Sequence, residues 1–416
     1  MNPYSHKAWL AYILISGTLL SIPLFLSGGM VFEGLLLILI NPGVLITDYL
    51  SVGGFYPTLF NVLGLMVINV GILMAIKQPF NGPVLAGLMT IAGFAFFGKS
   101  MINFIPIYLG IFMYTLWMKQ PLHQHSVVML FSSAIGPLVS YLWFGTEGPL
   151  YLRLILGTLA GVGSGIFTPM LSIQARKVHQ GLNLYNIGFT LGIISTFFGL
   201  WIRLMGLDTS SQVPLSEAYN RPLWVLNSIL LVGLIIFALS SPKRDETYQD
   251  LLKASGIGED FISLFGLKNT LFNMVFLSLL GYGLVLILGL TLNGPLIAGL
   301  WTMIGFGAYG KHIKNSIPLI AGVLLGILLG VNSIDQIGAV IAIFFVTALA
   351  PITGRYGVIV GILAGFIHLT LLPVAYQIQG GFDLYNNGFA AGFVGYFVIL
   401  GMKGFTALKV LKPKKI

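Results

Sequence analysis

The sequence of 416 residues contains no cysteine, and only 8% of its residues are charged. The absence of cysteine excludes disulfide bonds, thiolate metal ligands and a cysteine nucleophile. The shortage of charge is matched by 56% hydrophobic residues, gathered in apolar runs that recur along the whole chain. Because a helix needs about 20 mostly apolar residues to cross a bilayer, these runs predict an all-α polytopic membrane protein. We expect about 12–15 membrane segments, some of them broken by glycine or proline or re-entrant.

Acidic residues are scarcer than basic ones, since 12 Asp and Glu stand against 21 Lys and Arg. In a soluble protein this excess could indicate a nucleic-acid partner, but in a membrane protein basic cytoplasmic loops that fix orientation explain it. We therefore expect the lipid bilayer as a partner and no nucleic acid. The first apolar run, at 8–26, lacks a small-residue cleavage site, and many further runs follow it. We interpret it as a membrane segment and not as a cleaved signal peptide.

Two stretches of the sequence occur twice. NGPVLAGLMTIAGFAFFGK at 81–99 returns as NGPLIAGLWTMIGFGAYGK at 293–311, an offset of 212 (293 minus 81). GLNLYNIGFTLG at 181–192 returns as GFDLYNNGFAAG at 381–392, an offset of 200 (381 minus 181). These matches predict two membrane repeats within one chain. The predicted parts are N-terminal membrane segments at 1–56, repeat 1 at 57–205, a connecting span with a cytoplasmic linker at 206–268, repeat 2 at 269–405 and a basic cytoplasmic tail at 406–416.

Loop charge predicts how the repeats are oriented. The linker around 241–260 and the tail carry clusters of Lys and Arg, which stay cytoplasmic when they lie near membrane segments. The second repeat lies between these clusters, so it must cross the membrane an even number of times. One further span separates the linker from the first repeat, and we therefore expect two inverted repeats in a multi-pass protein of the inner (plasma) membrane. This arrangement places Lys311 in a cytoplasmic loop, whereas Lys99 does not fit it.

Asparagine and tyrosine recur in the repeated phrases and suggest a binding site. Asn followed by Gly-Pro is the pattern of a helix start, with Asn as the cap and Pro in the first turn. Inside the bilayer the free N–H groups of such a start would face a pathway, whereas at the membrane surface it would be an ordinary hairpin turn. The Tyr-Asn phrases suit a small polar solute, or alternatively they only hydrogen-bond broken backbone. The candidate substrate-binding residues are Asn81, Asn293, Tyr185, Asn186, Tyr385 and Asn386.

Two ionisable residues are candidates for coupling transport to an ion gradient. Asp383 stands where the first repeat has Asn183. An acid near the membrane midplane could bind a cation or carry a proton, whereas an acid at the outer interface would simply be hydrated. His368 lies within an apolar run, opposite Thr168 of the first repeat, and is either a titrating group or a packed histidine. Asp48 is expected at the membrane interface.

The repeated phrases resemble those of urea transporters, which also carry two inverted repeats, each with an Asn-Asn-Pro-like helix start and a Gly-Leu-x-Gly-Tyr/Phe-Asn-Gly phrase. The counterparts here are residues 81–83 and 181–186 with their second copies, although Asn-Gly-Pro replaces Asn-Asn-Pro and Leu184 and Leu384 replace a glycine. The whole pattern, including Leu-Tyr-Asn-x-Gly-Phe, is more similar to an uncharacterised family of duplicated bacterial membrane proteins. This resemblance implies a duplicated membrane fold and no particular substrate.

Together these features predict a transporter or channel for a small polar solute, neutral or anionic, with a pathway between the two repeats. The alternative is a proton- or sodium-coupled secondary transporter that uses Asp383. An intramembrane enzyme is less favoured, because Ser164 in a Gly-Ser-Gly phrase has no accompanying histidine and acid, and we expect no catalytic residue, cofactor or metal. A membrane scaffold would not need two polar phrases. The sequence leaves the oligomeric state open and is compatible with a homo-oligomer.

Overall fold

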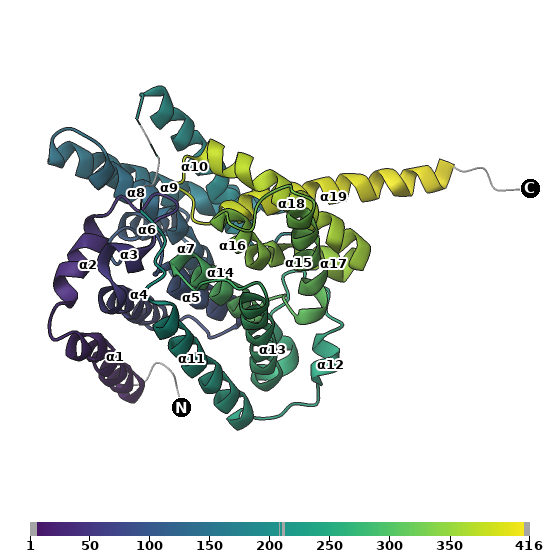
Figure 1. Ribbon diagram of the computed structural model, residues 1–416, viewed down its shortest axis with the longest axis horizontal. Helices are drawn as coiled ribbons and strands as arrows, with labels where there is room; N and C mark the ends of the chain where they lie inside the picture. Colours follow the sequence, from purple (N-terminus) through teal and green to yellow (C-terminus); the bar gives the residue numbers. More distant parts are fainter. Residues whose placement is uncertain (1–5, 208, 210–212, 412–416) are drawn as a thin grey trace, which may run out of the picture.

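The computed structural model describes residues 6–207, 209 and 213–411, and this part of the chain is built from helices and contains no β-strand (Figure 1). The predicted basic tail lies outside the described residues from position 412 onward. The helices up to the end of the first predicted repeat are α1 (His6–Leu26), α2 (Val31–Ile40), α3 (Tyr49–Gly53), α4 (Phe55–Ala75), α5 (Gly82–Phe94), α6 (Ile105–Trp117), η1 (Leu122–His125), α7 (Ser126–Ser132), η2 (Ser133–Ile135), α8 (Gly136–Ser140), η3 (Tyr141–Gly145), α9 (Leu150–His179) and α10 (Asn186–Leu204).

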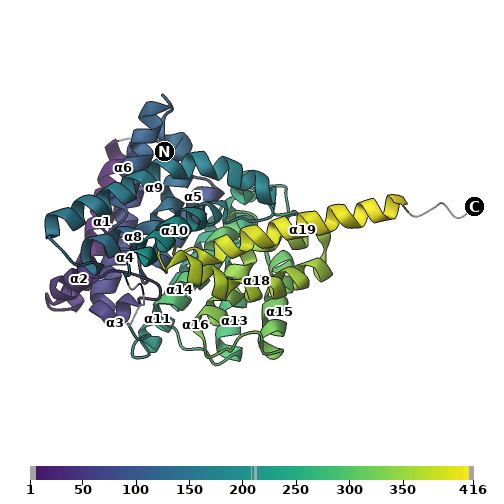
Figure 2. The same ribbon diagram turned by 90° about the horizontal axis from the view of Figure 1, so that it is seen from above.

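The remaining helices repeat this order after a connection. The connection contains α11 (Asn220–Ser240) and the short linker helix α12 (Tyr248–Leu251). The helices of the second half are α13 (Phe261–Ile287), α14 (Gly294–Gly305), η4 (Phe306–Ala308), α15 (Ile313–Leu328), α16 (Ile337–Phe345), η5 (Val346–Leu349), α17 (Ala350–Tyr356), α18 (Val358–Gln379) and α19 (Asn386–Leu411). Figures 1 and 2 show that the C-terminal part of α19 extends beyond the rest of the molecule.

Ten helical segments of the described chain are long and apolar enough to cross a membrane. Two of them, Leu122–Gly145 and Ile337–Tyr356, are divided into several short helices. Four shorter apolar helices, α5, α6, α14 and α15, form two pairs, and the breaks within the pairs contain Lys99 and Lys311. The structure therefore confirms the prediction of an all-α polytopic membrane protein with broken helices.

The two halves correspond beyond the repeated phrases. Helix α4 begins after Gly54, and α13 is kinked at Gly266, 212 positions later (266 minus 54). Both glycines have positive φ, 86° and 76°, a conformation that side chains with a Cβ rarely adopt. The same offset relates Asp48 to Asp260, and each forms a single-pair bridge, with Phe97 or with its counterpart Tyr309. The shared geometry thus reaches upstream of position 57.

The halves contact each other reciprocally. Helices α5 and α14 pack antiparallel, because a Cβ added to Gly93 would lie 3.0 Å from Cα of Ala298, while one added to Gly305 would lie 2.5 Å from Cβ of Met89. The backbone N–H of Leu184 donates to the carbonyl of Ala348 at 2.9 Å, and the equivalent Leu384 donates to Ala134 at 3.1 Å. Each half thus makes an equivalent contact with the other half, which indicates an approximate twofold axis between them.

The two Asn-Gly-Pro phrases begin α5 and α14, as the sequence predicts. The side chain of Asn81 accepts a hydrogen bond from Val84 N at 3.0 Å, and Asn293 accepts one from Leu296 N at 3.0 Å. Proline occupies the first turn in both helices, where its missing N–H leaves no bond unmade.

Carboxylates of the opposite half bind the backbone at these helix starts. Gly82 N donates to Asp260 Oδ1 at 2.9 Å, and Gly294 N donates to Asp48. Asp48 also accepts from Leu50 N at 3.0 Å and Ser216 N at 2.9 Å. Asp48 is fully buried, so it is not a hydrated surface residue, and its expected depth at the membrane interface stays a prediction. Its carboxylate is retained in the interior because three backbone donors replace water.

Candidate functional site

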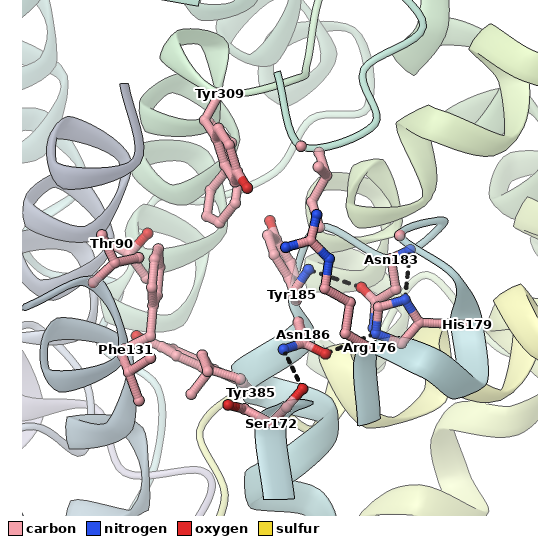
Figure 3. A pocket seen from close by; sticks show the side chains of 18 of the residues that line it. Thr90, Phe131, Ser172, Arg176, His179, Asn183, Tyr185, Asn186, Tyr309 and Tyr385 are labelled. Carbon is pink, nitrogen blue, oxygen red and sulfur yellow. Dashed lines mark hydrogen bonds between the residues drawn. The ribbon is translucent and has the colours of Figure 1, made fainter. Parts of the chain in front are cut away.

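A cavity of about 270 Å³ lies between the two halves (Figure 3). Its wall combines the C-terminal end of α9 and the start of α10 with residues of α5, α7, α14, η4, α16 and the second Tyr-Asn phrase. The polar and aromatic lining residues are Thr90, Phe131, Ser172, Arg176, His179, Asn183, Tyr185, Asn186, Thr302, Phe306, Tyr309, Phe345, Tyr385 and Asn387. Both predicted phrases therefore contribute to one cavity.

The cavity runs from the surface into the interior. Arg176 is exposed and Tyr309 is partly exposed, so these side chains mark the mouth, together with Gly258 of the linker. Thr90 and Thr302 are buried, with 1% and 2% of their surface exposed, and form the inner end. The hydroxyl of Thr302 has no hydrogen-bond partner among the described residues, so a polar group that enters the cavity can bond to it.

The first Tyr-Asn phrase is held in place by side-chain hydrogen bonds. Nε2 of His179 lies 2.9 Å from Oδ1 of Asn186, whose Nδ2 donates to the carbonyl of Ser172 at 3.0 Å. Oδ1 of Asn183 accepts from Tyr185 N at 2.8 Å, and its Nδ2 donates to the carbonyl of Gly388 at 2.9 Å. Figure 3 shows these residues along one wall of the cavity. The bonds fix the start of α10 and the position of the Tyr185 ring.

Six aromatic side chains form a closed ring at the twofold axis. The ring centroids of Phe94 and Tyr385 are 4.8 Å apart, and those of the equivalent pair, Phe306 and Tyr185, are also 4.8 Å apart. The other four neighbouring pairs, at 5.5 to 6.3 Å, join these two pairs through Phe131 and Phe345: Phe94–Phe345, Phe345–Tyr185, Phe306–Phe131 and Phe131–Tyr385. Five of the six rings, all except Phe94, line the cavity. We call this closed arrangement of six side chains the aromatic ring. It lies at the centre of the interface between the halves.

Two buried lysines lie directly against the aromatic ring. Nζ of Lys311 donates to the hydroxyl of Tyr185 at 2.6 Å and lies 4.4 and 4.7 Å from the ring centroids of Tyr185 and Phe306. Nζ of Lys99 donates to Ser133 Oγ at 2.7 Å and lies 5.5 Å from the ring centroid of Tyr385. Both lysines are 0% exposed.

Lys311 lies in the connection between two short helices, but its side chain is turned into the protein and is fully buried. Its predicted cytoplasmic side stays a prediction. Sequence reasoning did not identify either lysine as a site residue. The signal was available, since Lys99 and Lys311 end the longest repeated phrase at equivalent positions.

The other predicted site residues are placed in different ways. Tyr185, Asn186 and Tyr385 line the cavity, whereas Asn81, Asn293 and Asn386 do not. Asn387 lines it in place of Asn386, and Oδ1 of Asn387 lies 3.1 Å from Nε2 of the buried His368.

The coupling candidate Asp383 is fully buried. The structure thus excludes the hydrated interfacial position that was the alternative for this residue. Oδ1 of Asp383 accepts from Tyr385 N at 2.8 Å, as Asn183 Oδ1 does from Tyr185 N, and Oδ2 has no partner among the described residues. A buried carboxylate oxygen without a donor is costly unless it carries a proton or meets a cation.

The positions equivalent to the cavity mouth are closed. Gly181 and Arg176 at the mouth correspond to Gly381 and Tyr376 at an offset of 200. Gly381 is buried, and its carbonyl accepts from Leu45 N at 3.0 Å. The hydroxyl of Tyr376 donates to the carbonyl of Leu45 at 2.7 Å. The segment around Leu45 therefore covers the place where an equivalent cavity would open.

The same asymmetry separates the segments that precede the two repeats. Residues 44–48 are buried except for the partly exposed Ile46, whereas the equivalent residues 256–260 are mostly exposed or partly exposed. Phe97 is 1% exposed, whereas its counterpart Tyr309 borders the cavity mouth. Two similar halves thus adopt an open arrangement at one end of the interface and a closed arrangement at the other.

Comparison with known proteins gives a family and no activity. A family model described as protein of unknown function (DUF1576) matches residues 28–203 and 243–403. No curated protein and no solved structure matches the chain.

Proposed function

The chain belongs to the DUF1576 family of proteins of unknown function, and we propose that it is a membrane transporter that moves a small polar solute between two inverted repeats. One observation carries this proposal. The interface between the repeats is open to a cavity at one end and closed at the equivalent positions of the other end. A transporter that exposes a central site alternately to the two sides of a membrane needs these two arrangements.

The antiparallel packing of α5 and α14 supports inversion of the repeats. Equivalent helices that run in opposite directions along the membrane normal are related by an axis in the membrane plane. The contacts of Gly93 with Ala298 and of Gly305 with Met89 give this pair opposite directions. An in-plane axis makes the mouth of the cavity and its closed counterpart face opposite sides of the membrane.

The hydrogen bonds of one segment differ between the two arrangements. The closed end depends on the hydrogen bonds of Leu45 with Gly381 and Tyr376. At the open end Ile257, the counterpart of Leu45, donates its backbone N–H to Ser255 Oγ at 3.2 Å instead. Because each half already shows one of the two arrangements, the opposite state can be formed by exchanging them.

The charged residues near the cavity mouth indicate which side it faces. Arg176 and Lys177 lie at the mouth end of α9, and the adjoining linker carries Lys243, Arg244 and Lys253. Basic residues near membrane segments remain on the cytoplasmic side. We therefore assign the open end to the cytoplasmic side. The solute site lies deeper in the cavity, at the aromatic ring.

Flux measurements on the purified protein test the proposal. Proteoliposomes that contain valinomycin, which lets potassium balance the charge of an entering anion, are mixed with urea, glycerol, potassium formate or potassium nitrate, and solute entry is followed by stopped-flow light scattering. We expect at least one solute to enter faster than in protein-free liposomes, and we expect a bulky maleimide on a Thr302→Cys variant to remove the difference. A Gln249→Cys variant is the control, because Gln249 is exposed in the linker and lies outside the cavity lining. Rates equal to those of protein-free liposomes for every solute would contradict transport.

A coupled form of the same function has one observation in its favour. The unpartnered Oδ2 of the buried Asp383 could gain and lose a proton during the cycle. In the first repeat Asn183 occupies the equivalent position and satisfies its own side chain. Proton-driven accumulation that requires Asp383 would support this second form.

A further inference from the structure

We infer that the solute is a small anion, bound at the inner end of the cavity under the positive charge of Lys311 and Lys99, an inference that rests on the proposed function. The notable feature is the sign of the charges around this cavity. Among the residues that line it, Arg176 is the one permanently charged side chain, and none is Asp or Glu. A cavity with one sign of charge and low-dielectric walls concentrates ions of the opposite sign.

The geometry of the lysines favours ammonium groups. Nζ of Lys311 lies over the faces of Tyr185 and Phe306, at 4.4 and 4.7 Å from the centroids. The negative face of a single aromatic side chain attracts a cation, and the attraction is strongest where water is excluded. Lys99 has the equivalent position at Tyr385 and Phe94. When a lysine carries its proton, the faces of these side chains therefore stabilise the ammonium group.

Neither ammonium has a carboxylate to balance it. The one ion pair found among the described residues, with N···O within 4 Å, joins Lys253 and Asp250 at the surface. It does not involve Lys99 or Lys311. A buried lysine without a charged partner tends to lose its proton, so an anion in the adjacent cavity would stabilise the ammonium form. Tyr185 and Phe306 form both the cavity wall and the face on which Lys311 lies. An anion in the cavity is therefore one aromatic side chain away from the ammonium.

The inner end of the cavity also offers a free donor. Thr302 precedes Phe306 by one helical turn, is 2% exposed and has an unpartnered hydroxyl. The hydroxyl can donate to an anion that lies against the aromatic ring. The volume of about 270 Å³ is below that of a site for drug-sized ligands. These features suit a compact anion such as a small carboxylate or an inorganic oxyanion.

The charge preference can be measured without knowing the solute. A single cysteine is introduced by Thr302→Cys into the otherwise cysteine-free chain. Its rate of modification is measured in proteoliposomes with two methanethiosulfonate reagents, one bearing a sulfonate and one a trimethylammonium group. Each rate is divided by the rate of the same reagent with a Gln249→Cys variant, whose thiol would be exposed in the linker. We expect the sulfonate reagent to be preferred by about tenfold or more, because both lysines contact side chains that line the cavity and an entering anion would stabilise their ammonium forms.

Lysine variants identify the source of the preference. In the Thr302→Cys background, Lys311→Met and Lys99→Met should each lower the preference severalfold, whereas Lys311→Arg should keep it. An equal or reversed preference for the trimethylammonium reagent would overturn the anion inference and leave transport of another solute standing. An unchanged preference in both Lys→Met variants would also overturn it. Failure of both reagents to react would contradict the cavity itself and so the proposed function as well.

Discussion

Gly188 and Gly388 meet across the interface between the repeats. A Cβ added to Gly188 would lie 3.2 Å from Cα of Gly388, and one added to Gly388 would lie 3.0 Å from Cα of Gly188. The Cβ added to Gly188 would also lie 2.8 Å from Cβ of Tyr385, and the Cβ added to Gly388 would lie 3.1 Å from Cβ of Tyr185. The two tyrosines of the aromatic ring are therefore positioned by a backbone contact that only glycine allows.

Substitution at this contact should destabilise the protein. We expect Gly188→Ala and Gly388→Ala each to lower the free energy of unfolding by about 1–3 kcal/mol, because the backbones must separate. The measurement is thermal unfolding in detergent by intrinsic fluorescence. The matched control is Gly163→Ala, also in a helix but with open space around the added Cβ, which should be neutral or stabilising. Equal behaviour of all three variants would show that the contact is not tight.

The buried lysines should reduce stability when no anion is bound. Lys311→Met and Lys99→Met replace an unbalanced charge by an apolar side chain of similar length, so we expect unfolding free energies higher by about 1–4 kcal/mol. Unfolding is measured in a buffer of large, poorly penetrating anions. Lys253→Met is the control, since this exposed lysine should change stability by less than about 0.5 kcal/mol. Loss of stability in both buried-lysine variants would contradict the account.

The carboxylates that reach across the interface should differ in importance. Asp48→Ala leaves three backbone N–H groups without an acceptor in a fully buried place, and each such group costs about 1–3 kcal/mol. Asp260→Ala should cost less, because Asp260 is partly exposed and water can replace it. Urea unfolding of both variants, with the exposed Asp245→Ala as the control, checks this order. A larger loss for Asp260→Ala would contradict it.

Asp383→Asn separates uncoupled from coupled transport. The substitution gives the second repeat the residue of the first, where Asn183 donates its amide to a backbone carbonyl. We expect the variant to be at least as stable as the natural chain and to retain solute flux, with no dependence on a pH gradient in either protein. The measurement is flux into proteoliposomes with and without an imposed proton gradient. Gradient-driven accumulation by the natural chain that disappears in Asp383→Asn would instead establish coupling.

Local patterns in the sequence predicted much of the fold. Apolar runs gave the membrane class, and Asn-Gly-Pro gave the starts of α5 and α14, because both signals depend on neighbouring residues alone. The Tyr-Asn phrases contribute Tyr185 and Tyr385 to the cavity between the halves, and their binding of a solute stays a prediction. The orientation of the repeats and the solute pathway remain predictions.

Burial of single polar residues was harder to predict. Asp48 and Lys311 both follow apolar runs and read as loop residues, yet packing against the opposite half buries them. Their partners are distant in sequence, since Asp48 bonds to Ser216 and Gly294 and Lys311 bonds to Tyr185. Propensity and hydropathy contain no information about such contacts. Comparison of the two repeats does contain such information, because Asp48 and Lys311 have the counterparts Asp260 and Lys99 at the same offset.

The most direct test of alternating exposure uses equivalent cysteines in the two repeats. Ser172 lines the open cavity, and its counterpart Leu372 is 6% exposed at the closed end. A membrane-impermeant maleimide is applied to either face of oriented membrane vesicles that contain Ser172→Cys or Leu372→Cys. We predict that Ser172→Cys reacts from the linker face alone and that Leu372→Cys reacts, more slowly, from the opposite face alone. Reaction of both variants from the same face would contradict the inverted, alternately exposed interface.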